Sequence, residues 1–143
     1  APIWGGTRPN VVPPEAGCEI DCRVTSIPEG ERIERLIHAM AGEADGIRIE
    51  VEGGMNRPPM VETPEIVALY DMARGLAATH GYDLPKQHRG GGSDGNFTAA
   101  IGVPTLDGLG CTGAGAHAPF EHILWQDLAP RCATLCALLE SID

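Results

Sequence analysis

The sequence is poor in aromatic residues and in positive charge. Phe, Trp and Tyr make up 4% of its 143 residues, and 10 Lys and Arg stand against 20 Asp and Glu, which gives a formal net charge of −10. A surface of that sign opposes nonspecific binding to nucleic acid or to anionic lipid. No apolar run reaches the roughly 18 residues that a membrane helix requires. We therefore expect neither a nucleic-acid partner nor a membrane partner.

Glycine and proline, by contrast, are abundant. The 19 Gly and 12 Pro follow no triplet period, which excludes a collagen-like chain. A hydrophobic fraction of 43% and a charged fraction of 21% are typical of a globular protein. The excess of Gly and Pro is therefore expected in turns and loops, much of it in residues 5–14, 53–64, 90–95 and 108–119.

The five cysteines do not form the even set of a secreted disulfide framework. They comprise two C-x-x-x-C pairs, Cys18 with Cys22 and Cys132 with Cys136, together with Cys111. Two such pairs would in principle hold zinc, but the usual zinc spacing is C-x-x-C in a tight turn. We expect buried free thiols that act as small hydrophobic residues, which favours a reducing, cytoplasmic compartment.

The first third of the chain predicts a strand, a helix and a second strand. Apolar and polar residues alternate over 17–24 and over 47–52, a pattern typical of half-buried strands. Between them Ser26 and Glu29 have the spacing of a capping box, and the helix that follows is predicted to run to about Ala41. This order favours an α+β module with helices on one side of an antiparallel sheet.

The rest of the chain predicts alternating helices and strands, as in half of an α/β layer. A domain junction is expected in the turn-rich residues 53–64. A helix is predicted from Thr63 and Pro64 to His80 and Gly81, which have the chemistry of a helix start and a helix end. The further expected elements are a short strand at 84–89, a helix from Ser93-Asp94 to Gly102 and a buried strand at 103–109. A last helix is expected from about Leu124 to Ser141, and because Pro130 lies inside that span this helix is expected to be kinked or to begin later.

Two side chains stand out as candidates for chemistry. His117 lies in a Gly/Ala loop after a predicted strand, where an imidazole is free to serve as a metal ligand or general base, unless it is a loop histidine without a function. Glu121 is placed to hold its second ring nitrogen. Arg57, before two prolines, presents a guanidinium that can grip a carboxylate bidentately, unless it is a surface arginine at a hinge.

The triple glycine Gly90–Gly92 before Ser93-Asp94 is ambiguous. Backbone N–H groups at such a helix start can face an anion. The nucleotide-binding patterns G-x-G-x-x-G and G-x-x-x-x-G-K-[ST] do not fit this segment. Ser93 also lacks the G-x-S-x-G elbow of a nucleophilic serine.

Five short motifs stand in a fixed order along the chain: Gly5-Gly6-Thr7-x-x-Asn10-Val11-Val12-Pro13, Asp21-x-Arg23, Arg57-Pro58-Pro59, Gly91-Gly92-Ser93-Asp94 and Gly113-x-Gly115-x-His117-x-x-x-Glu121. Their order and spacing resembles the zinc-dependent aminoacylase and carboxypeptidase family, which includes acetylornithine deacetylase, succinyl-diaminopimelate desuccinylase and glutamate carboxypeptidase. Residues 91–97 and 106–110 are most similar to the glutamate carboxypeptidase branch.

The resemblance implies a two-domain fold, α/β plus α+β. An α/β catalytic domain holds two zinc ions, and a smaller α+β lid domain also makes the homodimer. Residues 1–57 would be the C-terminal part of the lid and dimerisation domain, and residues 58–143 the C-terminal part of the catalytic domain.

The resemblance also implies roles for four residues. His117 matches the last metal-ligand histidine of the family. Arg57 matches the arginine that binds the substrate carboxylate, and Gly92 matches a backbone contact in the same pocket. Asn10 matches the lid asparagine that meets the substrate or its carboxylate.

The other functional motifs of the family are expected upstream of Trp4. They are a His-x-Asp pair, a Glu-Glu pair whose first Glu is the general base, one further carboxylate, and a lid histidine lent by the dimer partner. The sequence therefore predicts part of a dinuclear zinc metallohydrolase that releases an amino acid such as glutamate from an N-acyl amino acid or a peptide. The chain alone is expected to bind no stoichiometric zinc, to have no catalytic residue and to be inactive. Two alternatives are a non-catalytic binding or interaction module of the same fold, and a small complete enzyme that uses Ser93 with His117.

Overall fold

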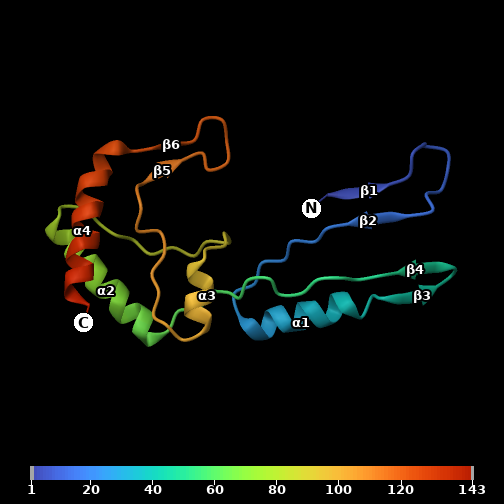
Figure 1. Ribbon diagram of the computed structural model, residues 1–143, viewed down its shortest axis with the longest axis horizontal. Coiled ribbons are helices and arrows are strands. Elements are labelled where there is room, and N and C mark those ends of the chain that lie inside the picture. Colours follow the sequence, from blue (N-terminus) through green and yellow to red (C-terminus); the bar gives the residue numbers. More distant parts are fainter. Residues whose placement is uncertain (1, 143) are drawn as a thin grey trace.

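A computed structural model describes residues 2–142 and shows an elongated molecule of mixed α and β content (Figure 1). This mixed content agrees with the expected fold class at that level. The elements are β1 (Ile3–Gly5), β2 (Ala16–Cys18), α1 (Ile27–His38), β3 (Gly42–Ala44), β4 (Ile47–Ile49), α2 (Pro64–Thr79), α3 (Gly95–Ala100), β5 (Gly113–Ala114), β6 (His122–Ile123), the 3-10 helix η1 (Trp125–Asp127) and α4 (Leu128–Ser141).

The strands form three separate antiparallel hairpins. β1 pairs with β2, β3 with β4, and β5 with β6. The expectation of a single antiparallel sheet with helices on one side is therefore wrong for residues 2–142. The predicted strand at 17–24 pairs only as far as Cys18, because the segment beyond it turns to other partners: Arg23 donates a hydrogen bond to the Gly90 carbonyl oxygen.

Two helix starts form as the sequence predicts. The Ser26 hydroxyl accepts a hydrogen bond from the Glu29 N–H at 3.4 Å, and the Thr63 hydroxyl accepts one from the Ile66 N–H at 3.3 Å. The capping box of α1 is only half formed, because the Glu29 carboxylate pairs with Arg32 at 2.7 Å. Helix α2 ends at a His80 cap, followed by Gly81 in the left-handed region at φ +83°, as predicted.

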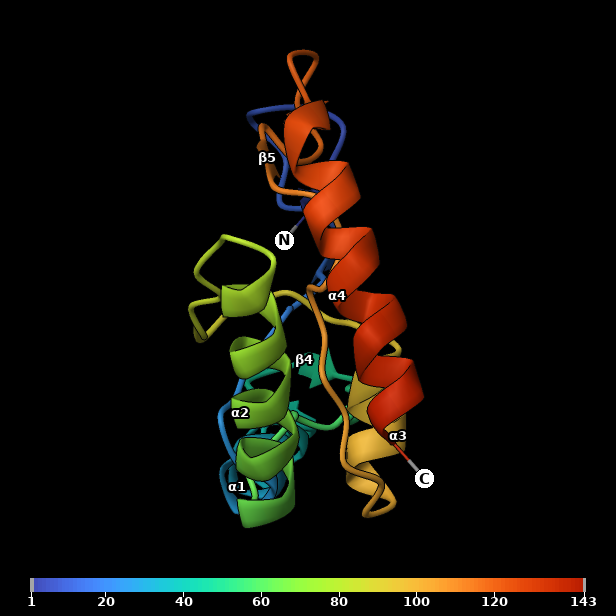
Figure 2. The same ribbon diagram turned by 90° about the vertical axis from the view of Figure 1, so that its left-hand side faces the viewer.

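The core lies between α2 and α4, which run side by side (Figure 2). Ala73 and Ala77 of α2 are fully buried, and their small side chains let the two helices approach closely. Leu138 of α4 is 4% exposed. Thr134, one turn earlier, is also buried and donates its hydroxyl to the Pro130 carbonyl at 2.9 Å, so it leaves no unpaired polar group in the core.

The strands expected at 84–89 and 103–109 do not form. Instead, Leu84, Leu106 and Leu109 pack against the α2–α4 core from extended segments. Each segment contains a proline, which withholds one backbone donor from any ladder. Helix α4 begins at Leu128, after η1, which places Pro130 in the first turn where its missing N–H costs nothing. The later helix start is therefore confirmed.

The cysteines are free thiols, but their expected burial is wrong for four of the five. Cys18, Cys22, Cys132 and Cys136 are exposed, and Cys111 is half-buried. Along α4 the buried positions are Thr134 and Leu138, and a residue two places before each lies about 200° around the helix. The two helical cysteines therefore point away from the core. Cys18 and Cys22 lie at and beyond the end of a hairpin that no helix covers.

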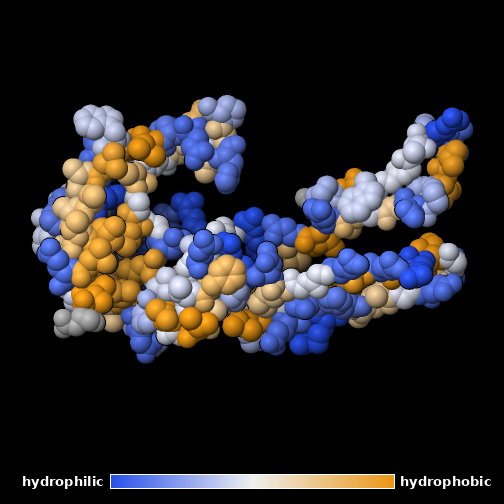
Figure 3. Space-filling model, in the orientation of Figure 1, coloured by the Kyte–Doolittle hydropathy of each residue, from blue (hydrophilic) through white to orange (hydrophobic). Residues whose placement is uncertain are grey.

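The molecule exposes a large surface for its size. Its accessible area is 11079 Å², whereas a compact monomer of 15.1 kDa exposes about 7,100 Å². Apolar residues lie on the outer faces of several elements, among them the orange patches over α2 and α4 in Figure 3. Within residues 2–142 no helix combines the length and the apolar character needed to cross a membrane.

Candidate functional site

Arg57 lies against the segment around α3, far away in the sequence. Its Nη2 donates a hydrogen bond to Asp94 Oδ1 at 3.2 Å, and its guanidinium carbon lies 5.0 Å from the centroid of the Phe97 ring. The side chain is 34% exposed. A cation over an aromatic face is held electrostatically, so the guanidinium is oriented on two sides while part of it faces solvent.

Gly92 makes this position of Arg57 possible. A Cβ atom at residue 92 would lie 3.0 Å from Arg57 Nη1 and 3.1 Å from its Cδ, closer than nine in ten real Cβ contacts. A Cβ at Gly91 would meet nothing within 4 Å. The structure thus brings together two of the four predicted site residues, Arg57 and Gly92, and the close approach of the backbone explains the glycine.

Asn96 ties the two segments to one another. Its Nδ2 donates to the Pro58 carbonyl at 2.8 Å, and its Oδ1 accepts from the Ser93 N–H at 3.1 Å. The Ser93 hydroxyl accepts from the Gly95 N–H at 3.1 Å, so it supports the turn. This pairing gives no support to Ser93 as a nucleophile paired with His117.

Sequence reasoning missed Asn96 and Phe97 as parts of this arrangement, and it took Asp94 only as a helix cap. Asp94 occupies the N-cap position of α3 but makes no capping hydrogen bond with its side chain. The Asp94 side chain pairs with Arg57 instead, a contact that no local sequence pattern predicts. The one available signal was position, because all three residues lie within five places of Gly92.

Arg23 approaches the same glycine turn from the N-terminal part of the chain. Its Nη1 donates to the Gly90 carbonyl at 2.5 Å, and its Nη2 pairs with Asp21 at 3.1 Å. The sequence assigned no role to Arg23. In the structure it connects residues near the end of β2 with the turn that seats Arg57.

His117 lies in the connection between β5 and β6. It has φ +66°, in the left-handed region that few non-glycine residues adopt, and it follows Gly115 at φ +76°. The Ala118 N–H donates to the Gly115 carbonyl at 2.8 Å, which closes the turn. Glu121 accepts from the backbone N–H of His117 at 3.3 Å, so the expectation that its carboxylate holds the imidazole ring is wrong.

Asn10 lies in the connection between β1 and β2 and is exposed. Figure 1 shows both the β1–β2 and the β5–β6 connections on the upper side of the molecule, the first at the right-hand end of its long axis and the second nearer the middle. In the part of the chain that the structure describes, no hydrogen bond joins Asn10 or His117 to Arg57. The structure therefore does not bring Asn10 and His117 together with the other two predicted residues.

The residues around His117 do not fit a two-metal centre by themselves. Among residues 2–142 no group of three or more His, Cys, Asp or Glu side chains is placed to hold a metal ion. The nearest histidine in the sequence, His122, has its Nδ1 3.1 Å from the Phe120 carbonyl oxygen. A catalytic zinc ion usually takes three protein ligands and a water molecule, and His117 alone would supply only one of them.

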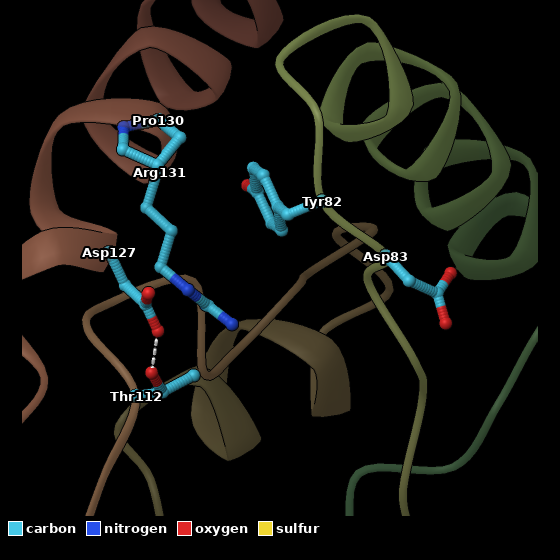
Figure 4. Close-up of a pocket in the computed structure, with 6 residues that line it drawn as sticks. All are labelled: Tyr82, Asp83, Thr112, Asp127, Pro130 and Arg131. Atoms are coloured by element: carbon cyan, nitrogen blue, oxygen red, sulfur yellow. Dashed lines mark hydrogen bonds between the residues drawn. The ribbon is translucent and has the colours of Figure 1, made fainter.

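A small pocket of about 120 Å³ lies elsewhere, beside the start of α4 (Figure 4). Arg131 extends into it, donates to the Gly110 carbonyl at 2.7 Å and lies 5.4 Å from the centroid of the Tyr82 ring. Thr112 donates to Asp127. Because these polar groups bond to one another and no predicted site residue lines the pocket, we interpret it as a structural junction that fixes α4.

An arginine seated on a glycine turn can orient a carboxylate, and a loop histidine can serve as one metal ligand. The sequence matches the peptidase family M20/M25/M40 over residues 2–141, and the chain belongs to this family. Its members are peptidases and related hydrolases that generally use metal ions, typically zinc. This confirms the resemblance at the level of the family. Comparison with curated proteins and with solved structures gives no significant match.

Proposed function

We propose that this chain supplies the carboxylate-binding part of a zinc-dependent amidohydrolase or carboxypeptidase. The intact enzyme would release an amino acid such as glutamate from an N-acyl amino acid or a peptide, as in the glutamate carboxypeptidase branch. The observation that carries the proposal is the seating of Arg57 on Gly92 and Phe97. A guanidinium oriented in this way matches the planar geometry of a carboxylate.

In this proposal Arg57 binds the free carboxylate of the substrate and thereby fixes the position of the amide to be cleaved. Gly92 lets the guanidinium lie close to the backbone and offers a backbone contact in the same pocket. Asn10 would meet the substrate from the lid. When the substrate carboxylate is held in one orientation, the amide to be cleaved is held in a defined position as well. Such positioning of the reacting group raises the reaction rate.

His117 is proposed as one metal ligand of the intact centre. The remaining ligands and the general base would come from outside residues 2–142, because the donors within them do not fit a metal centre. We accordingly expect the 143-residue chain alone to bind no stoichiometric zinc and to hydrolyse no N-acyl glutamate. Metal analysis of the purified chain and an assay with N-acetyl-L-glutamate test this expectation, and turnover by the chain alone would overturn it.

The domain boundary is proposed at 57/58, with the lid and dimerisation part before it. Exposed apolar side chains on β4, Ile47 at 64% and Ile49 at 48%, support an association through an open strand edge there. A reducing, cytoplasmic compartment is also proposed, and the five free cysteines are consistent with it, since disulfides are rare in such compartments.

The proposed role of Arg57 is tested by binding rather than by turnover. The chain is titrated with N-acetyl-L-glutamate and followed by NMR, with Arg57→Ala and Arg57→Lys compared with Arg48→Ala, an exposed arginine of β4. Hydrogen bonds to charged groups are worth about 1.5–3 kcal/mol, so Arg57→Ala should weaken binding roughly tenfold or more. Arg48→Ala should match the unsubstituted chain. Unchanged binding by Arg57→Ala would sink the proposal.

A non-catalytic binding module of the same fold is the second candidate, and it is favoured by the observation that residues 2–142 form no cluster of metal donors. The protein isolated from its source separates the two by intact mass and metal content. A longer chain with His-x-Asp and Glu-Glu segments and two zinc ions supports the enzyme. A metal-free protein of 15.1 kDa that still binds N-acetyl-L-glutamate supports the module.

A further inference from the structure

The Arg57 guanidinium is surrounded on most sides by this chain's own atoms. Nη1 lies beside the Gly92 backbone, where a Cβ would come within 3.0 Å, and one face covers the Phe97 ring. Nη2 is paired with Asp94 Oδ1 at 3.2 Å. Gly92 and Phe97 are neutral, so Asp94 is the one partner of the three that resembles a substrate carboxylate in chemistry.

The Asp94 carboxylate has no other described partner. Its side chain is 95% exposed, and although it occupies the N-cap position of α3 it makes no capping hydrogen bond. The supporting contacts of the turn are made by Ser93 and Asn96 instead. The helix-capping role that usually explains an aspartate at such a position is therefore unused here.

From this arrangement we propose that Asp94 is an internal competitor for the carboxylate-binding arginine. The proposal rests on the proposed function of Arg57. In the free protein Asp94 occupies Nη2, and an incoming carboxylate must displace it to grip the guanidinium with both oxygens. Asp94 thereby lowers the affinity of the site for weakly binding anions, because any carboxylate ligand must replace the ion pair that Arg57 makes with Asp94.

The size of the effect follows from the exposure of the pair. Solvent-exposed ion pairs contribute little, about 0.2–1 kcal/mol, which corresponds to a competition of up to about fivefold. Asp94→Asn removes the charge and keeps the shape, so it should tighten N-acetyl-L-glutamate binding by about 1.4- to fivefold. Asp94→Glu keeps a competing carboxylate and should stay close to the unsubstituted chain.

The dependence of ligand binding on ionic strength is a second measurement, and it would not change if Asp94 had only a structural role. In the unsubstituted chain, binding replaces the Arg57–Asp94 ion pair with a pair between Arg57 and the ligand carboxylate. In Asp94→Asn the ligand binds an Arg57 side chain that has no anionic partner. The dissociation constant should therefore rise more steeply with ionic strength in Asp94→Asn. Glu50→Gln, at an exposed carboxylate paired with Arg48, removes the same charge elsewhere and controls for net charge.

The test is an NMR titration of the whole chain and these variants with N-acetyl-L-glutamate at two ionic strengths, with Arg57→Ala alongside. Tighter and more salt-sensitive binding in Asp94→Asn, but not in Glu50→Gln, is the expected result. Equal or weaker binding in Asp94→Asn overturns the competitor role. If Arg57→Ala binds as well as the unsubstituted chain, the proposed function itself fails, and the two failures are thereby distinguished.

Discussion

At the scale of single residues, Gly92 contributes to the site by leaving space for the guanidinium beside it. The distance of 3.0 Å from a notional Cβ to Arg57 Nη1 leaves a methyl group no room unless the arginine moves. The arginine would have to shift by a few tenths of an ångström, which changes its position over Phe97 and toward a ligand. The site therefore depends on a glycine for reasons of space rather than of backbone conformation.

Gly92→Ala should consequently weaken N-acetyl-L-glutamate binding by about three- to tenfold, the size of a charged hydrogen bond that is strained but not lost. Gly91→Ala is the matched control, because a Cβ there meets nothing within 4 Å. Both are measured by the same NMR titration, with the Arg57 side-chain signals reporting its displacement. Equal affinities for the two variants would contradict this account of the turn.

At this scale the sequence predicted the features that depend on residues adjacent in the chain. The Thr63 cap, the Gly81 helix end and the later start of α4, at Leu128 with Pro130 in its first turn, all follow from local chemistry, and all are present. The pairing of Arg57 with Asp94 was not predictable, because it joins segments that only tertiary structure brings together. The burial of the cysteines was mispredicted for the same reason.

At the scale of elements, the core lies in the α2–α4 pair. Two neighbouring leucines of α4 are the same residue type but differ in burial, so comparing them shows what burial contributes to stability. Leu138 is 4% exposed and Leu139 is 65% exposed. Leu138→Ala removes buried methyl groups and leaves a cavity, so it should lower the free energy of unfolding by about 2–5 kcal/mol. Leu139→Ala should change it by less than about 0.5 kcal/mol. Urea unfolding compares the two, and similar losses would show that α4 is not anchored through Leu138.

The start of α2 is expected to weaken in acid. Hydrogen bonds from the Glu65 backbone N–H and from Thr63 hold the pKa of the Glu65 carboxyl below its ordinary value of 4.5. A carboxyl with a lowered pKa in the folded state stabilises that state above pH 4.5, and loses this contribution as the pH falls through the lower folded value. Helix content followed by circular dichroism should fall below pH 4.5, and less so in Glu65→Gln. An identical acid profile for that variant would count against the carboxyl.

The strand predictions failed at this scale for a physical reason. Alternating residues over 17–24 and 47–52 describe a chain able to join a sheet, but pairing needs a neighbouring strand in register. Among residues 2–142 each hairpin has only its own partner, so the ladders end at Cys18 and Ile49, apart from one further hydrogen bond from the Glu19 N–H to the Pro2 carbonyl oxygen. The periodicity therefore predicted that these segments are able to form strands, but not which strand each of them would pair with.

At the scale of the whole molecule, the exposed area of 11079 Å² exceeds that of a compact monomer of this mass by roughly half. Large apolar side chains such as Val12, Ile101 and Trp125 contribute to it, at 89%, 79% and 76% exposed. The purified chain should bind the dye ANS and sediment as an extended or self-associating species. A compact monomer in analytical ultracentrifugation that does not bind ANS would contradict the open arrangement.

Because the three hairpins form no common sheet, they also determine how the molecule unfolds. Each is closed by local bonds and shares few contacts with the rest, while α2 and α4 bury one another. Regions with few buried contacts open at low free energy, independently of the most protected unit. The chain is therefore not a single cooperative unit: its α2–α4 pair would keep amide hydrogens protected while the loops that carry Asn10 and His117 exchange freely. The scaffold is thus firmest away from two of the residues assigned to its chemistry.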